Sequence, residues 1–206
     1  MTKRLRYQVA TSLDGFIATP NGGYDWIVMD PAIDFKALYN EFDTVVMGRK
    51  TYDLAKEQAN HGAMPGMEIV AFSRTLAPAE YPGVRIVNDD PTAVVRELKT
   101  KRGKDIWLFG GGELFRVLLD AGLVDSVELA VMPVLLGDGI PVLPPGAQAT
   151  LELSDVKRLS ATGIVVLAYS VAGSTARPPR IRYVKARRKA RRATPNGKRR
   201  SKSRKR

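Results

Sequence analysis

The chain has 206 residues, 44% of them hydrophobic, with 33 Lys and Arg against 21 Asp and Glu and a formal net charge of +12. This length suits one domain with a sizeable core. No apolar run approaches the ~20 residues that cross a bilayer, so we expect no membrane partner. The chain has no cysteine and one histidine, His61, which excludes disulfides, thiolate metal sites and multi-histidine metal sites. We therefore expect a cytoplasmic protein without a bound metal.

The positive charge is concentrated at the C-terminal end. Residues 174–206 contain 16 Lys or Arg and no Asp or Glu, which leaves 17 basic and 21 acidic side chains for residues 1–173. A segment so poor in apolar residues cannot offset its ordering entropy, so we predict a disordered tail after a mildly acidic domain. Such a polycation binds nucleic-acid phosphates with little sequence preference. The alternative is a merely solubilising extension.

Apolar runs, caps and turn signals predict the following elements in chain order. They are a strand over 5–12, a helix over 34–41, a strand over 44–47, a helix from 49, strands over 68–73 and 84–87, a helix over 90–103, a strand over 105–109, a helix over 113–121, a strand over 126–134, and a final antiparallel pair over 151–159 and 165–171. Strands that alternate with helices indicate an α/β protein whose sheet is mainly parallel and covered on both faces.

Two junctions between a strand and a helix carry residues suited to phosphates. In the first, Gly48 precedes Arg49, Lys50 and Thr51 at a helix start, where free amides and cations suit a phosphate monoester such as the 2′-phosphate of NADPH. In the second, glycines 110–112 follow an apolar strand and would let a pyrophosphate lie against the main chain. Each motif alone is also compatible with a solvated turn or with tight packing. Neither matches G-x-G-x-x-G, so a Rossmann fold is not indicated.

Taken in order, the motifs of this chain resemble those of the dihydrofolate reductase superfamily, over about residues 4–172. The motifs are Ser12 to Ala18, Asp25-Trp26, Val46 to Tyr52, Phe72 to Arg74, Phe109 to Leu114 and Pro133 to Gly139. More narrowly, the chain is similar to the branch that contains the C-terminal reductase domain of the riboflavin-biosynthesis deaminase/reductase. The resemblance implies a three-layer α/β/α sandwich with an antiparallel C-terminal strand, a domain spanning residues 1–173, and a homodimer.

The resemblance also implies an NADPH site. Ala10 and Ile17 would flank the nicotinamide, residues 21–26 would form a loop that closes over it, and the Gly110–Gly111 bond would be a cis peptide. The other cofactor residues that it implies are Asn21, Gly48, Arg49, Lys50, Thr51, Ser73, Arg74, Phe109, Gly110, Gly111, Gly112, Glu113 and Leu114, with Trp26 on the substrate side.

The residues that protonate the pterin in dihydrofolate reductases are not matched. The position of their carboxylate corresponds to the region around Pro31-Ala32 in this chain. The position of its threonine partner corresponds to a place near Leu129, whose side chain cannot make the hydrogen bond. The candidate proton donors are therefore Asp14, Asp30 and Asp34, for which a turn or a helix cap is the alternative role.

Two hypotheses follow for the whole chain. The first is an NADPH-dependent reductase of a small heterocyclic, pteridine- or pyrimidine-like, or carbonyl substrate, in which the cofactor supplies the hydride. The second is a nucleic-acid-associated protein that binds through residues 174–206 and whose reductase-like body is inactive.

Overall fold

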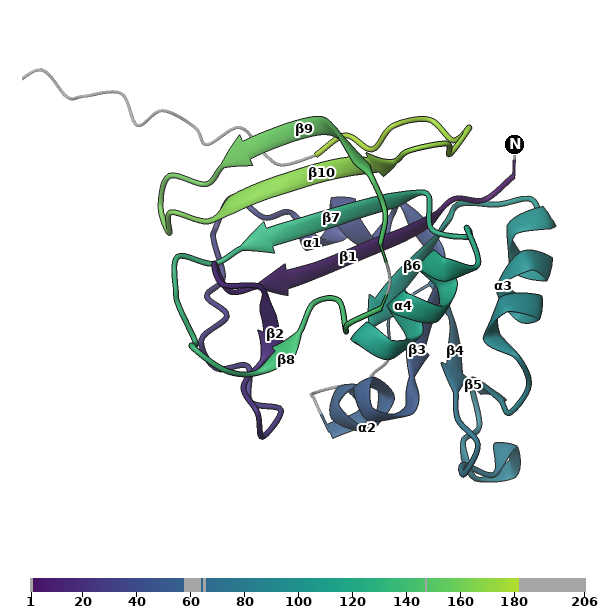
Figure 1. The fold of residues 1–206 in the computed structure, drawn as a ribbon. Helices are drawn as coiled ribbons and strands as arrows, with labels where there is room; N and C mark the ends of the chain where they lie inside the picture. The colour runs from purple at the N-terminus through teal and green to yellow at the C-terminus, as the bar shows by residue number, and fades with distance from the viewer. Residues whose placement is uncertain (1, 58–63, 65, 147, 182–206) are drawn as a thin grey trace, which may run out of the picture.

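The computed structural model describes residues 2–57, 64, 66–146 and 148–181, and His61 lies outside them. The described residues form an eight-stranded sheet in the order β5-β4-β3-β6-β1-β7-β10-β9, and a separate two-stranded pair, β2-β8 (Figure 1). The strands are β1 (Leu5–Thr11), β2 (Phe16–Ala18), β3 (Phe42–Gly48), β4 (Glu68–Phe72), β5 (Val84–Val87), β6 (Asp105–Gly110), β7 (Ser126–Val131), β8 (Ile140–Pro141), β9 (Leu151–Arg158) and β10 (Val165–Val171). The helices are α1 (Phe35–Tyr39), α2 (Arg49–Glu57), α3 (Pro91–Thr100) and α4 (Gly112–Asp120), with a 3₁₀ turn at Pro78–Glu80.

The direction of the strands confirms the predicted fold class. β1 runs parallel to β6 and β7, and β3 runs parallel to β6 and β4, which in turn runs parallel to β5. β10 is antiparallel to both of its neighbours, β7 and β9. The first six strands in the spatial order are therefore parallel, and the antiparallel strand lies near the C-terminal edge.

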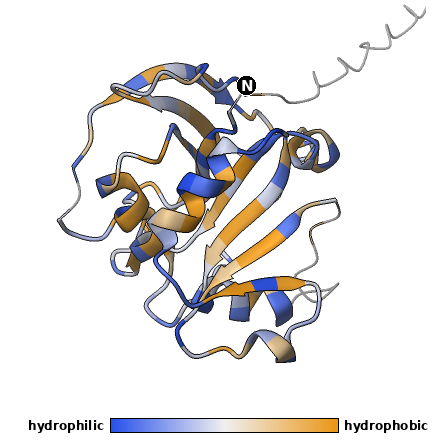
Figure 2. Cartoon of the chain, turned by 90° about the vertical axis from the view of Figure 1, so that its right-hand side faces the viewer, coloured by the Kyte–Doolittle hydropathy of each residue, from blue (hydrophilic) through white to orange (hydrophobic). Residues whose placement is uncertain are grey.

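Helices cover both faces of the sheet, as predicted. Successive side chains of a strand point to opposite faces, so Val46 of β3 packs with α3 and α4, whereas Val45 and Met47 pack with α1 and α2. Figure 2 shows the central strands mostly in the hydrophobic colour. Burial of each such side chain stabilises the fold by about 1.5–3 kcal/mol, so the strands are held from both sides.

The chain changes direction between β3 and β6, which are neighbours in the sheet. Met47 of β3 is paired with Gly110 of β6. The helix after β3, α2, lies on one face, and the helix after β6, α4, lies on the other. In α/β sheets such a switch point leaves a crevice outside the carboxyl ends of the two strands.

Some predicted boundaries were wrong. α1 spans only 35–39, because Asp34 caps it by accepting a hydrogen bond from the Ala37 amide at 2.9 Å and the chain enters β3 at Phe42. α3 ends at Thr100 rather than 103. Gly103 is needed for another reason: its φ is 150°, and a Cβ there would clash with Asp43 Oδ2. β7 ends at Val131 rather than 134, and the β2–β8 pair was not predicted.

The first part of the predicted tail contacts the domain. The Ser174 hydroxyl donates to Asp125 at 2.9 Å, and the Ile181 amide donates to Asp155 at 3.0 Å. Ile181 also packs on an apolar cluster that includes Ile164. Residues 182–206, where most of the cationic tail lies, are outside the described residues. Within the part of the chain that the structure describes, no helix is long and apolar enough to cross a membrane.

Candidate cofactor and substrate cleft

A cleft of about 1500 Å³ lies along the carboxyl edge of the parallel strands. Its junction end is lined by the β3–α2 and β6–α4 junctions and by residues 72–75 and 87–91 that follow β4 and β5. Its apolar end is lined by residues of the 22–39 segment and by β1, β7 and β10. Sites for one small molecule measure about 300–1,000 Å³, so the cleft has room for two ligands.

The backbones of the two junctions approach each other closely. A Cβ on Gly48 would lie 3.9 Å from the Gly111 nitrogen, and Cβ atoms on Gly110 and Gly111 would lie 3.5 and 3.3 Å from Thr51 Oγ1. The Gly110–Gly111 peptide is cis, which confirms the prediction. Gly111 is the N-cap of α4, and no side chain caps this helix. The amides of its first turn are therefore available to an anion.

Charged side chains of both signs surround the junction end. Arg49 and Lys50 are exposed at the start of α2, and Arg49 forms an ion pair with Asp53 at 2.6 Å. Arg74 is exposed after β4. Asp90 also lines this end, but its carboxylate caps α3 by accepting from the Thr92 amide at 3.0 Å.

Ser73 shapes the turn that carries Arg74. Its hydroxyl oxygen accepts hydrogen bonds from the amides of Thr75 and Leu76 at 3.1 and 3.0 Å, and its carbonyl accepts one from the Asn88 side chain at 2.7 Å. Ser73 is buried, so its main effect is to hold Arg74 at the cleft.

The structure brings together nearly all of the predicted cofactor residues. Those that line the cleft are Ala10, Ile17, Gly48, Arg49, Lys50, Thr51, Ser73, Arg74, Phe109, Gly110, Gly111, Gly112, Glu113 and Leu114. Asn21 and Trp26 are not among its lining residues, whereas Gly22 and Tyr24 are. Trp26 packs on the apolar cluster around Met132, and its indole N–H donates to the Gly23 carbonyl at 3.3 Å.

Asp14 lies outside the cleft lining and stabilises a turn. Its carboxylate accepts hydrogen bonds from the Leu136 and Gly137 amides at 3.0 and 2.7 Å, and from the Ser12 hydroxyl at 2.6 Å. Together, the Ser12 hydroxyl and these two amides lower the pKa of Asp14 to about 2. Asp14 is therefore ionised at neutral pH, which disfavours it as a proton donor.

Asp30 and Asp34 also lie outside the cleft lining. The Ala32 amide and the Thr162 hydroxyl donate to Asp30 at 2.8 and 2.7 Å and lower the pKa of its carboxyl. A carboxylate–threonine pair thus exists, but its threonine lies between β9 and β10 rather than at Leu129 on β7. Asp34 is occupied as the cap of α1.

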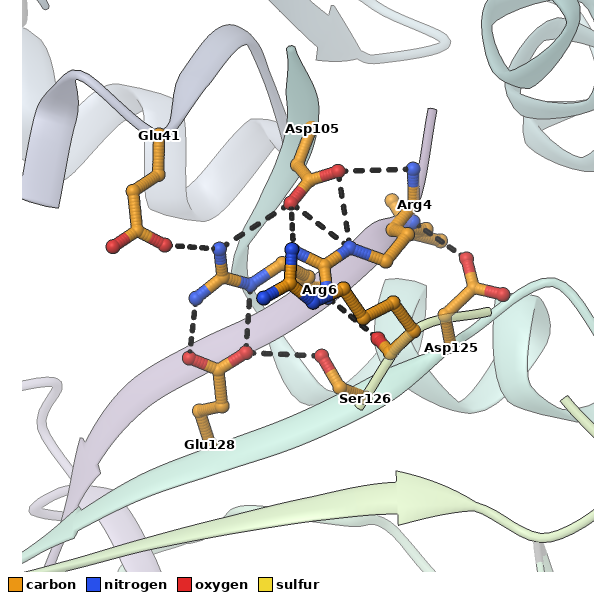
Figure 3. Close-up of polar contacts among 9 residues, drawn as sticks. Arg4, Arg6, Glu41, Asp105, Asp125, Ser126 and Glu128 are labelled. Atoms are coloured by element: carbon orange, nitrogen blue, oxygen red, sulfur yellow. Dashed lines mark hydrogen bonds and ion pairs between the residues drawn. The ribbon is translucent and has the colours of Figure 1, made fainter. Parts of the chain in front are cut away.

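A polar strip at the apolar end was not predicted from the sequence. Arg6 and Gln8 of β1 lie on the face that carries α1, and Gln8 is paired in register with Glu128 of β7. Figure 3 shows Arg6 held by Glu128, which accepts from its guanidinium at 2.7 and 2.6 Å, and by Glu41 at 2.5 Å. Burial alone lowers the pKa of Arg6, but the two glutamates more than offset this and raise it above its ordinary value. The only sequence signal for this strip was two polar residues at alternate positions of a strand, Arg6 and Gln8.

The comparison with protein families places the chain. The model of the RibD C-terminal domain matches residues 3–166. The chain belongs to the RibD C-terminal domain family. Two uncharacterised proteins of Bacillus subtilis (strain 168) are similar to it: YyaP, 34% identical over 81% of this chain and 94% of its own length, and YwjB, 31% identical over 69% and 83%.

Solved structures share the fold of this RibD C-terminal domain. A protein from Shewanella sp. PV-4, provisionally assigned to riboflavin biosynthesis, superposes with a TM-score of 0.70 at 24% identity, over 83% of this chain and 99% of its own. The diaminohydroxyphosphoribosylaminopyrimidine deaminase/5-amino-6-(5-phosphoribosylamino)uracil reductase of Thermotoga maritima gives 0.63 at 16% identity, over 83% and 57%. The pyrimidine reductase-like protein of Corynebacterium diphtheriae gives 0.56 at 16%, over 84% and 93%.

Proposed function

We propose that this chain is an NADPH-dependent reductase that transfers a hydride to a small pteridine- or pyrimidine-like heterocycle or to a carbonyl compound. The observation that carries the proposal is the junction end of the cleft, where the starts of α2 and α4 meet beside uncapped amides and exposed cations. Membership of the RibD C-terminal domain family supports the reductase class. Reductase is also the activity named for the related Thermotoga protein.

The residues present fit a dinucleotide. The glycines at 48, 110 and 111 leave the space in which a pyrophosphate can approach the main chain, and the first-turn amides of α4 would donate to it. Lys50 and Arg74 would contact the phosphates of the adenosine part. When bound, the cofactor supplies the hydride. Ala10 and Ile17, which both line the cleft, would position the nicotinamide.

Charge decides which nicotinamide dinucleotide binds. Arg49, Lys50 and Arg74 favour the additional 2′-phosphate of NADPH, whereas a carboxylate at this place is typical of sites that hold the free ribose hydroxyl of NADH. Asp90 is already committed to α3 and Glu113 pairs with Arg116, so three cations stand against one further carboxylate, Asp89, among the described lining residues of this end. The assignment of Asp14, Asp30 or Asp34 as the proton donor stays a prediction.

Calorimetric titration of NADPH and NADH tests this function. We expect wild type to prefer NADPH, and replacement of Lys50 and Arg74 by alanine to weaken NADPH about 10–100-fold more than NADH, because a charged hydrogen bond contributes about 1.5–3 kcal/mol. Arg96→Ala, an exposed cation outside the cleft lining, is the control. Equal weakening of both cofactors would refute the role of the cations, and no binding of either would refute the function.

A further inference from the structure

One face of the C-terminal edge of the sheet exposes a row of apolar side chains. Leu151, Leu153 and Val156 of β9 are 38%, 58% and 55% exposed. Their half-buried partners in register on β10 are Val171, Tyr169 and Leu167. Figure 1 shows α3 and α4 over the other strands, and none of the described helices in front of β9 and β10. These six side chains form a surface that is called the open face below.

A bulge in β9 gathers the apolar side chains of this strand on the open face. The pairing with β10 passes from Asp155 directly to Leu153, so Ser154 is the extra residue. Because side chains alternate along a regular strand, Leu153 and Val156 would point to opposite faces without the bulge. With the bulge, both are opposite β10 residues whose side chains share one face.

The open face carries almost no charge. Glu152 and Lys157 alternate with the apolar residues of β9 and point to the opposite face. Asp155 points there as well, and its carboxylate accepts a hydrogen bond from the Ile181 amide at 3.0 Å. Arg158, the last residue of β9, is the only charged side chain that β9 and β10 place on the open face. The core of a protein interface is likewise depleted of charged residues.

The free edge of β9 is less suited to a partner than the open face is. The Val156 amide donates to the Asp155 carboxylate at 2.9 Å, so this donor is already occupied. An edge strand with charged side chains and a bulge resists pairing with another strand. A partner at this end of the sheet is therefore expected on the face rather than along the edge.

We propose that the open face binds a second copy of this chain, and that the two sheets pack face to face across a two-fold axis. In such an interface each patch meets itself, so a charge near the axis would face a like charge. The open face avoids this, because its one charge, Arg158, lies at the end of the strand. Three strands of about seven residues cover on the order of 300 Å² in plan, which suits the apolar core of an interface of about 800 Å² per partner.

Sedimentation velocity of the full chain, at high salt that screens the basic tail, tests the proposal. We expect a dimer, and the double substitution Leu153→Lys and Val156→Lys to weaken it about 100-fold or more, because like charges then meet across the axis. Both positions are more than half exposed in the single chain, so the variant should keep its Tm. Glu152→Lys, on the opposite face of the same strand, is the matched control and should leave the dimer intact. A monomeric wild type, or equal weakening by Glu152→Lys, would overturn the proposal.

Cross-linking tests the same face without the double variant, should that variant fail to fold. The chain has no cysteine, so one introduced cysteine is the only thiol that a bismaleimide can join between two copies. Packed sheets lie about 10 Å apart, a distance that a short cross-linker spans. We expect Leu153→Cys to give a covalent dimer at low protein concentration, and Glu152→Cys to give none. No covalent dimer from Leu153→Cys, or the same yield from Glu152→Cys, would refute the open face as the interface.

Discussion

Arg6 is a cation in the interior of the protein, with a side chain that is 2% exposed, and its partner Glu128 is 4% exposed. Taking both charges out of water is costly, and only close hydrogen bonds offset that cost. Glu41 and Asp105 add further contacts at 2.5 and 3.4 Å. The guanidinium therefore stays charged, and it donates to both carboxylate oxygens of Glu128.

Removal of one partner of this pair should destabilise the fold. Glu128→Gln keeps the shape but removes the charge, and we expect the free energy of unfolding to fall by about 3 kcal/mol, at the low end for a broken buried pair because Glu41 remains. Glu97→Gln, which breaks the exposed pair of Glu97 with Lys101, should cost less than about 1 kcal/mol. Urea unfolding measures both, and similar losses would contradict the prediction.

Asp14 should make stability depend on pH in the acid range. Its folded pKa of about 2 lies below the ordinary value of 3.8 for an aspartate, so the folded state binds the proton less well than the unfolded state does. The resulting stabilisation is present above about pH 4 and is lost as the pH falls through 2. Asp14→Asn should therefore lower Tm at pH 7 and lose this effect near pH 2. A Tm difference that is constant with pH would refute the linkage.

At the scale of elements, the junction end depends on two glycine-containing turns from strands that are distant in sequence. Gly48 ends β3, and Gly112 begins α4. A side chain would have different surroundings at the two positions. At Gly48 the nearest atom to a new Cβ would be 3.9 Å away, whereas at Gly112 a Cβ would lie 2.9 Å from Pro144 Cδ and 3.0 Å from the Pro141 carbonyl oxygen.

Two alanine substitutions should separate binding from folding. Gly48→Ala should fold with nearly wild-type stability but bind NADPH at least about tenfold more weakly, because its methyl group occupies the space between the two helix starts. Gly112→Ala should lower the free energy of unfolding by about 1–3 kcal/mol, because it overpacks the junction. Thermal unfolding and NADPH titration of both variants check this. Normal binding by Gly48→Ala would argue against a phosphate at this place.

At the scale of the whole molecule, the ordered unit includes residues beyond the predicted boundary at 173. Ser174 donates to Asp125, which also accepts from the Leu5 amide at 2.7 Å and pairs with Lys99. Ile181 closes the segment against the apolar cluster. These contacts connect the C-terminal segment to the first strand of the sheet.

A chain that ends at 173 should thus be less stable than one that ends at 181. We expect a loss of about 1–2 kcal/mol for the missing hydrogen bonds and the Ile181 contact, or about 2–8 °C in Tm for a domain of this size. Scanning calorimetry of the two truncated chains measures this loss.

The chain of residues 1–181 should also bind NADPH without the basic tail, and loss of binding on this truncation would place the cofactor site elsewhere. Nucleic-acid binding by the tail, the homodimer and the cytoplasmic location stay predictions.

The sequence by itself determined the alternation of strands and helices and both glycine junctions, whose residues line the cleft. These features are local: a strand's apolar run, a capping aspartate and a glycine each act within a few residues. The sequence also distinguished the cationic C-terminal tail from the acidic domain, because the net charge of a segment is counted from its residues and does not depend on the fold.

Only the tertiary structure decided what the distant residues do. Asp14 and Asp30 are candidate acids in the sequence, and the nearby Ser12 hydroxyl and Ala32 amide contribute most to lowering their pKa values. Hydrogen bonds from Gly137 and Thr162, over a hundred residues away, lower these pKa values further. Trp26 is packed into a cluster rather than the cleft, and Arg6 and Glu128 bind each other across two strands. Such roles depend on burial and on partners brought together by folding, neither of which a local pattern contains.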